Sequence, residues 1–346
     1  MIKLQIQETE KTEILRTKKG KGLSDRIYKY VTALLASSAP ISLFVIVAAI
    51  VVYAYPSIVV NGLHFLTSII WNPQLNGAVI MVDGIKTLQG SSYGLLVFLA
   101  GTLISSALAV LFGVPLGVGI AILISQFAPK RIAPAISFFV ELLAGIPSVI
   151  FGFWGFLVLA PFLLHSLEPF LANYLFFIPI FNRPIYSSGM LASGIVLALM
   201  IVPIIASISR DAMVQTPSEL KEGARALGLT DWEITRTIVL PYAKTGVFGA
   251  VILGLGRALG ETMAVAMVSG AAINILPKTL FYPLNTMAAF MALSMDSAFT
   301  DPTGMFVSAL VELALVLTII TTLVNVIARL IIRQGFFSRS ESVVRL

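Results

Sequence analysis

Four charged residues lie inside strongly apolar segments of this 346-residue chain: Arg257, Glu261, Glu141 and Glu312. A central arginine in a membrane helix costs ~2.5–3.5 kcal/mol on insertion scales, so it needs a partner or a task. Arg257 and Glu261 are four residues apart and would share one face of a continuous helix. A guanidinium presents a planar fork of donors that matches an oxyanion. We therefore expect Arg257 to face a transport pathway and bind an anion, and Glu261 to hold Arg257 when the anion is absent.

The alternative for this pair is a local ion pair that only lets the helix tolerate both charges. Arginine before glutamate is the weaker order for such a pair, which argues against helix stability as its whole purpose. Glycines at 254, 256 and 260 flank the pair and would let a neighbouring helix or a substrate come close.

A second segment of chemical interest runs from Glu141 to Ser148. Gly145 and Pro147 predict a break in a membrane helix, and the freed backbone groups must find partners. Broken helices often line substrate sites in transporters, so we expect Glu141 and Ser148 to border the pathway. A plain proline kink, with Glu141 bonded to the broken backbone, is the alternative. Glu312 lies near the end of an apolar segment, where it can snorkel, and receives no function.

The composition places these residues in an integral membrane protein. Hydrophobic residues make up 58% of the chain and charged residues 12%, against ~45–50% and ~25% in soluble domains. A disordered chain, a disulfide scaffold and a nucleic-acid-binding protein are excluded. The chain has no cysteine and two histidines, so neither thiol chemistry nor a histidine metal site is expected. It has no paired carboxylate site and no nucleophile elbow, so an enzyme is not expected either.

Six apolar segments are long enough to cross a ~30 Å hydrocarbon core. We read the second of them as one kinked helix, because glycines and Pro115 interrupt it but no polar turn divides it. The fold class is therefore all-α and polytopic, with six transmembrane helices. The predicted spans lie within residues 31–60, 87–129, 132–165, 184–208, 245–272 and 305–332.

The basic residues predict the orientation of these spans. One side of the membrane would carry 19 lysines and arginines, and the other only Lys86, Arg183 and Lys278. Cations accumulate on the cytoplasmic side, so both termini are predicted to be cytoplasmic. The tails are a basic segment, residues 1–30, without the features of a signal peptide, and residues 334–346. On the opposite side, Trp71 belongs to a cluster typical of interfacial turns.

The cytoplasmic loop 210–244 predicts two short helices. Thr216 is the expected cap of the first helix, with Pro217 at its first position. This helix would run to about Leu227 and stop at Gly228. A capping box at residues 230–233 then begins a second helix, which would end at Pro241.

The spacing within this loop resembles the "EAA" loop of ABC-importer permeases. The residues that carry the resemblance are Glu222, Gly223, Ala224, Gly228, Ile238, Leu240 and Pro241. Upstream, the segment 209–212 (Ser-Arg-Asp-Ala) is also similar to that family. The resemblance implies that the first loop helix docks in a cleft of a cytoplasmic ATPase. The chain has no G-x-x-x-x-G-K-[ST] stretch, so it is expected to hold no nucleotide or other cofactor, and ATP hydrolysis falls to the partner.

Two further strings, residues 144–148 and 256–262, resemble the PstC-type permeases of bacterial phosphate ABC importers. The resemblance implies a type I importer fold in which a first helix, residues 31–60, precedes a five-helix transmembrane domain, residues 88–333. Arg257 and Glu261 would be the family's paired membrane residues. The implied partners in the bacterial cytoplasmic membrane are a PstA-type permease, two copies of a PstB-type ATPase and an extracytoplasmic phosphate-binding protein.

Other assignments remain open from the sequence. The PstA type is itself similar, although the long first outer loop and the 256–262 string favour the PstC type. An ABC permease for another oxyanion or small solute would have the same loop. An ion-coupled secondary carrier, with Arg257 and Glu261 as a proton-linked pair, would leave the EAA-like loop without a role.

Overall fold

The computed structural model describes the backbone of residues 23–343 and the side chains of residues 25–330. The sequence predictions for residues 1–22 and 344–346 lie outside the described residues. The chain divides into two units, residues 1–52 and 53–346. The described part of the first unit is the beginning of helix α2 (Leu23–Asn61). The helix breaks and the loop 210–244 belong entirely to the second unit.

Six helices in the described residues are long and apolar enough to cross a membrane, which confirms the prediction of six spans. The architecture is mostly helical, as predicted, with one small β-hairpin added in a loop. The six helices are Asp25–Asn61, Leu96–Phe127, Ser148–Tyr174, Met190–Val214, Asp231–Gly260 and Met305–Leu330. Their main segments are α2, α4 (Leu96–Ile122), α6 (Ser148–Trp154), α9 (Met190–Val214), α12 (Leu240–Gly260) and α15 (Met305–Val343).

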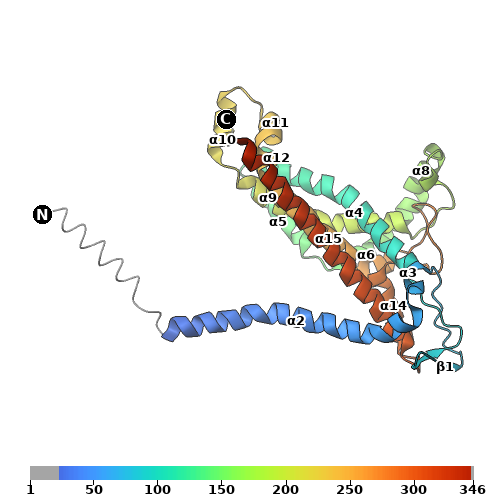
Figure 1. Cartoon of the computed structure of the whole chain (residues 1–346). Helices are drawn as coiled ribbons and strands as arrows, with labels where there is room; N and C mark the ends of the chain where they lie inside the picture. The colour runs from blue at the N-terminus through green and yellow to red at the C-terminus, as the bar shows by residue number, and fades with distance from the viewer. Residues whose placement is uncertain (1–22, 344–346) are drawn as a thin grey trace. The chain divides into compact units, whose positions relative to one another are not determined.

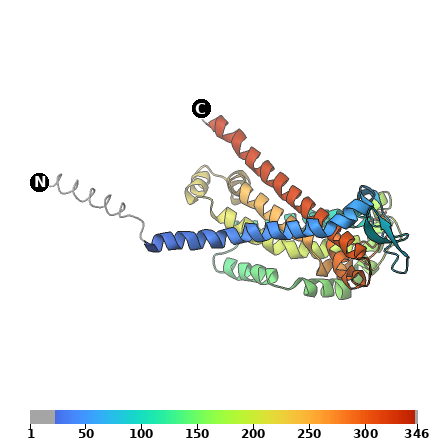
Figure 2. The ribbon, with the colours of Figure 1, turned by 60° about the horizontal axis from the view of Figure 1, so that its bottom comes forward.

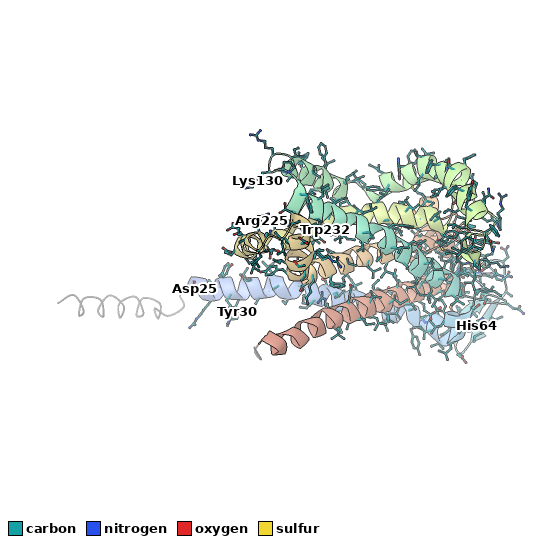
Figure 3. All side chains as sticks on the ribbon, turned by 90° about the horizontal axis from the view of Figure 1, so that it is seen from above. Asp25, Tyr30, His64, Lys130, Arg225 and Trp232 are labelled. Atoms are coloured by element: carbon teal, nitrogen blue, oxygen red, sulfur yellow. The ribbon has the colours of Figure 1, made fainter. Side chains whose placement is uncertain are left out.

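The two ends of the second unit differ in structure. Figure 1 shows α10 (Ser218–Ala226) and α11 (Asp231–Ile234) at one end, called the loop end here. The other, the hairpin end, carries α3 (His64–Thr67) and the antiparallel strands β1 (Val79–Val82) and β2 (Ile85–Leu88). Figure 3 shows Lys130, Arg225 and Trp232 at the loop end, and His64 at the opposite end.

Several span boundaries differ from the prediction. The second span is one helix, as predicted, although it begins only at Leu96 because Thr87 belongs to strand β2. The predicted third span is two pieces: α5 (Ala133–Ala144), then a longer helix from Ser148 to Tyr174. Figure 2 shows these pieces in green, one after the other. The fourth span, α9, continues through Arg210 to Val214, so this part of the predicted loop is helical.

Wide π turns precede Pro161, Pro169 and Pro241, which lie inside continuing helices, and Pro129, which lies just beyond a helix end. Pro115 and Pro203 lie inside α4 and α9 without such a turn. Each π turn among residues 23–343 is followed by a proline two residues after its end. Proline lacks an N–H group, and in an α-helix its ring clashes with the carbonyl four residues earlier, which the wider turn moves away. The pairs are Leu123–Phe127 with Pro129, Gly155–Leu159 with Pro161, Leu163–Leu167 with Pro169, and Thr235–Val239 with Pro241. The prediction that a short helix ends at Pro241 is therefore wrong, because the chain passes through Pro241 into α12.

Helix α9 is the best buried of the six candidate spans, and it packs mainly against α4 and α12. Glycines allow the close contact with α4: a Cβ atom at Gly113 would lie 2.7 Å from Ile201, and one at Gly117 2.8 Å from Ile205. Small residues at helix crossings replace the hydrophobic driving force that is missing in lipid. Helix α9 therefore forms the centre around which α4, α5, α12 and α13 (Met263–Val268) are placed.

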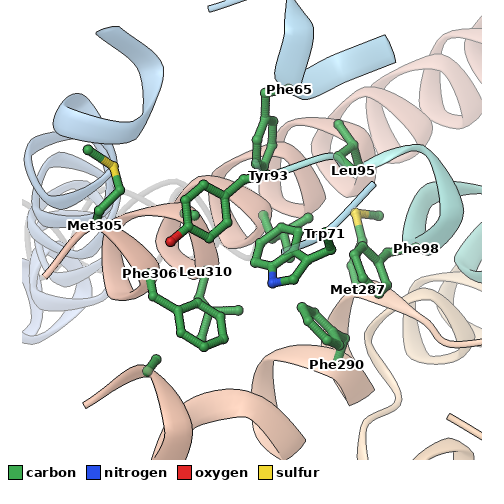
Figure 4. Close-up of a cluster of buried hydrophobic side chains, with 13 residues drawn as sticks. Phe65, Trp71, Tyr93, Leu95, Phe98, Met287, Phe290, Met305, Phe306 and Leu310 are labelled. Atoms are coloured by element: carbon green, nitrogen blue, oxygen red, sulfur yellow. The ribbon is translucent and has the colours of Figure 1, made fainter. Parts of the chain in front are cut away.

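An aromatic cluster closes the hairpin end. Trp71 is 3% exposed, and the rings of Phe65, Tyr93, Phe98 and Phe290 surround it at centroid distances of 4.9–6.3 Å (Figure 4). Trp71 lies outside the helices, as predicted for a turn, and its indole is a core side chain. Edge-to-face aromatic contacts of this kind stabilise beyond the buried area alone.

Glu312 also lies in the interior. It is 6% exposed and accepts a hydrogen bond from Ser57 Oγ at 2.5 Å, and Asn61 in turn donates to Ser57 Oγ at 2.9 Å. The expectation that Glu312 snorkels to the surface is wrong. Its carboxyl group instead joins α15 to the last turns of α2, where a polar side chain needs a partner.

Candidate functional site

Two helix breaks lie side by side in the structure. The first is the predicted one, where α5 ends at Ala144 and α6 begins at Ser148. The second separates α12, which ends at Gly260, from the short helix α13 (Met263–Val268). The fifth span was predicted to be continuous here, so this break is a correction. No proline marks it, and the glycines at 256 and 260 only weaken the helix.

Helices α6 and α13 pack closely and run parallel. A Cβ atom at Gly152 would lie 2.8 Å from the Cα of Ala264, and one at Gly155 would lie 2.9 Å from Val268 Cγ1. The residue numbers rise together along both helices, so the helices point the same way. By the same register, Met263 at the start of α13 lies at the level of Phe151, about one turn after Ser148. The starts of α6 and α13 therefore lie close to each other, beside the end of α12.

Arg257 lies in the last turn of α12, and its side chain is exposed in the isolated chain. A cation in the last helical turn interacts favourably with the helix dipole. Because α12 ends at Gly260, Arg257 and Glu261 do not share one helix face, which corrects that expectation. Among the side chains of residues 25–330 no ion pair joins Arg257 to Glu261, so the local ion-pair interpretation is wrong as well.

Glu261 takes a different partner. Its backbone is extended, with φ −69° and ψ 126°, and its carboxylate Oε1 accepts the N–H of Ala264 at 3.4 Å. The first N–H groups of any helix lack partners within the helix, and a side-chain oxygen often satisfies one of them. Glu261 thus supports the start of α13. It follows Arg257 by four residues in the sequence.

Glu141 pairs with a residue that the sequence analysis did not assign to it. The Glu141 Oε1 atom lies 3.1 Å from Nη1 of Arg210. Arg210 lies near the end of α9, and its guanidinium also contacts Asp211. The 209–212 segment was noted only for its family resemblance, and nothing in the sequence spacing indicates a contact across 69 residues. That Glu141 and Ser148 border a transport pathway stays a prediction.

Loop 210–244, called the coupling loop here, contains both predicted short helices, but the first has a different cap and the second continues through Pro241. Helix α10 begins at Ser218 with Pro217 as its cap residue, and Thr216 makes no capping hydrogen bond there. Gly228 follows the helix with φ +87°, a conformation that glycine adopts readily. The capping box is confirmed: Glu233 N–H donates to Thr230 Oγ1 at 3.3 Å, and Thr230 N–H donates to Glu233 Oε2 at 2.8 Å.

One face of α10 is buried and the other is open. Ala224 packs against Met213, Ile234 and Val239, whereas Glu222 and Gly223 are exposed. A Cβ atom at Gly223 would meet no other atom within 4 Å. Of the remaining residues in the EAA-like pattern, Gly228 is exposed, and Ile238, Leu240 and Pro241 are partly buried.

Charge is concentrated along this exposed surface. Arg225 Nη2 lies 3.0 Å from Asp231 Oδ1, which ties α10 to the start of α11. Partial burial and the neighbouring Arg225 lower the pKa of Lys221. A helix with one anchored apolar face and one open polar face is suited to docking in a groove of another protein.

Comparison with known proteins identifies the family. Residues 113–334 match the family described as "Binding-protein-dependent transport system inner membrane component". The chain belongs to this family. It is accordingly a multi-pass inner-membrane component of a binding-protein-dependent transport system, and it is not an enzyme.

Relatives of this inner-membrane component carry more specific names. "Phosphate transport system permease protein PstC 1" of Mycobacterium tuberculosis is 45% identical and aligns over 82% of this chain and 86% of its own length. PstC of Haemophilus influenzae is 37% identical and aligns over 90% of this chain and 93% of its own length. A solved structure titled as an inward-facing MetNI methionine ABC transporter is 20% identical, with TM-score 0.47 and coverage of 69% and 95%.

The close packing of α6 on α13 predicts the effect of one substitution. Gly152→Ala should lower the free energy of unfolding by roughly 1–3 kcal/mol, because the new Cβ must displace the α13 backbone. The thermal unfolding midpoint in detergent measures this effect. Gly119→Ala is the matched control, since a Cβ atom there meets nothing within 4 Å. Equal stability of the two variants would contradict the observed packing.

Proposed function

We propose that this chain is the transmembrane permease subunit of an ATP-driven importer that moves inorganic phosphate across the cytoplasmic membrane. The observation that carries the proposal is 37–45% identity, along most of both chains, to proteins named as PstC phosphate permeases. An importer of this kind needs a pathway that attracts an anion without trapping it, and a surface that receives the motion of an ATPase.

The paired helix breaks supply the first requirement. Phosphate is an oxyanion, and Arg257 offers a guanidinium fork of matching geometry at the end of α12. The starts of α6 and α13 lie close to this end of α12. Glu261 would keep the anion from binding too tightly, because its carboxylate repels it. We therefore propose Arg257, Glu261 and Ser148 as pathway residues, with Glu141 at the edge of this region.

The coupling loop supplies the second requirement. We propose that α10 docks on a cytoplasmic PstB-type ATPase through Glu222, Gly223 and the neighbouring surface. This assignment sets the loop end in the cytoplasm, together with both termini, which agrees with the basic residues there. Two ATPase copies, a homologous PstA-type permease and an extracytoplasmic phosphate-binding protein would complete the transporter.

The substrate is tested by ligand-stimulated ATP hydrolysis of the complete complex in vesicles. Phosphate with its binding protein should raise the hydrolysis rate severalfold, and sulfate at the same concentration should not. Radiolabelled phosphate must then accumulate in the vesicles only when ATP is supplied. Stimulation by sulfate or by a neutral solute instead would assign the chain to another ABC importer. Uptake by this chain alone, driven by an ion gradient, would overturn the ABC assignment itself.

A further inference from the structure

One ion pair joins the loop end of α9 to the helix that precedes the first break. Arg210 Nη1 donates to Glu141 Oε1 at 3.1 Å, while Nη2 and Nε donate to Asp211 Oδ1 at 2.8 and 3.0 Å. The arginine side chain is 20% exposed and that of Glu141 55% exposed. The guanidinium is therefore held from two sides, with one carboxylate on its own helix and the other on α5.

On one side, Arg210 is close to the coupling loop. Met213, three residues further along α9, is fully buried in the same hydrophobic cluster as Ala224 of α10, Ile234 and Val239. A displacement of α10 must therefore move the last turn of α9, because packed side chains transmit force rather than deform freely.

On the other side, Glu141 is close to the break. It lies one turn before the end of α5 at Ala144, and residues 145–147 then lead to Ser148 at the start of α6. Helix α6 in turn packs on α13, which follows the second break. A continuous path thus runs from α10 through the hydrophobic cluster around Met213, along α9 to Arg210, and across the Arg210–Glu141 ion pair to the proposed pathway.

We propose that the Arg210–Glu141 pair is a strut that transmits movement of the coupling loop to the helix break at residues 145–147. The proposal rests on the proposed function, because it assigns a task within the transport cycle. Arg210 and Glu141 are positioning residues that act on the pathway through α5. Partly exposed ion pairs contribute little to folding stability, so stability alone does not account for a strut of this kind.

The first test compares Glu141→Gln with Asp211→Asn in the reconstituted complex. Both variants remove one carboxylate partner of Arg210, but only Glu141→Gln breaks the contact between helices. Phosphate transported per ATP hydrolysed should fall about tenfold in Glu141→Gln, within the usual range of coupling energies. Asp211→Asn should not change this ratio appreciably.

Exchange of the two charges separates a strut from a merely structural contact. Glu141→Arg with Arg210→Glu, in the Asp211→Asn background to remove the like-charge neighbour, should restore most of the lost coupling. Equal losses in Glu141→Gln and Asp211→Asn would overturn the proposal. So would unchanged coupling in Glu141→Gln, or failure of both the single variant and the exchanged pair to assemble.

A second measurement does not depend on the substrate. The chain has no cysteine, so Ala144→Cys and Val214→Cys introduce unique spin-label sites at the ends of α5 and α9. The distribution of distances between the two labels should be narrow, with the same mean with and without ATP. Glu141→Gln should broaden this distribution. Equally narrow distances with Glu141→Gln would overturn the strut. If wild-type vesicles take up no phosphate, the proposed substrate fails, and these distances still decide the strut.

Discussion

Replacing Arg257 by glutamine should reduce ATP-driven phosphate uptake by roughly 100-fold or more while the complex stays assembled. A guanidinium fork makes two charge-assisted hydrogen bonds to an oxyanion, each worth about 1.5–3 kcal/mol, and every 1.4 kcal/mol is about tenfold. The substitution should not affect folding strongly, because Arg257 makes no ion pair with the other described side chains of this chain.

The measurement is the initial rate of phosphate uptake into vesicles, with the amount of assembled complex determined on the same sample. Arg257→Lys keeps the charge but loses the fork, so its rate should fall between the wild type and Arg257→Gln. Arg183→Gln is the matched control, because Arg183 is an exposed arginine that donates to Asn173 outside the paired breaks. Uptake by Arg257→Gln at the wild-type rate would reject the role of Arg257 in the pathway.

The sequence was sufficient to predict features that depend on local composition. Hydropathy is a one-dimensional signal, so all six spans were found. The break at Gly145 and Pro147 follows from two neighbouring residues that each destabilise a helix. The capping box at Thr230 was equally local. Prolines were less informative, since Pro161, Pro169 and Pro241 lie within continuous spans that π turns make possible.

Features that depend on distant contacts were not predictable. The break after Gly260 has no proline, and Glu261 supports it by binding an amide of the following helix. Trp71 was expected at an interface, but rings from four other segments bury it. Arg210 and Glu141 meet only because α5 packs against α9, and spacing along one sequence contains no record of that contact. Of the two breaks that form the candidate site, only the one at residues 145–147 was therefore predicted.

The second large effect concerns the coupling loop. Glu222→Lys should abolish the docking of the ATPase, because it reverses an exposed charge on the open face of α10. Removing one partner of a buried interfacial charge pair costs about 2–5 kcal/mol, and reversing it adds repulsion, so affinity should fall by roughly 100-fold or more. Phosphate-stimulated ATP hydrolysis should then be lost, although the permease itself folds normally.

Capture of the ATPase by tagged permease from detergent solution measures docking directly. Glu219→Lys is the matched control: it makes the same charge reversal on the same exposed helix, outside the EAA-like pattern. It should lower the stability of helix α10 by only about 0.3–1 kcal/mol, through the unfavourable interaction of a cation with the helix dipole. Capture of the ATPase should stay largely intact. If Glu222→Lys captures as much ATPase as the wild type, then α10 is not the docking element. If both variants lose ATPase capture equally, docking depends on the total charge of the surface, and Glu222 makes no specific contact.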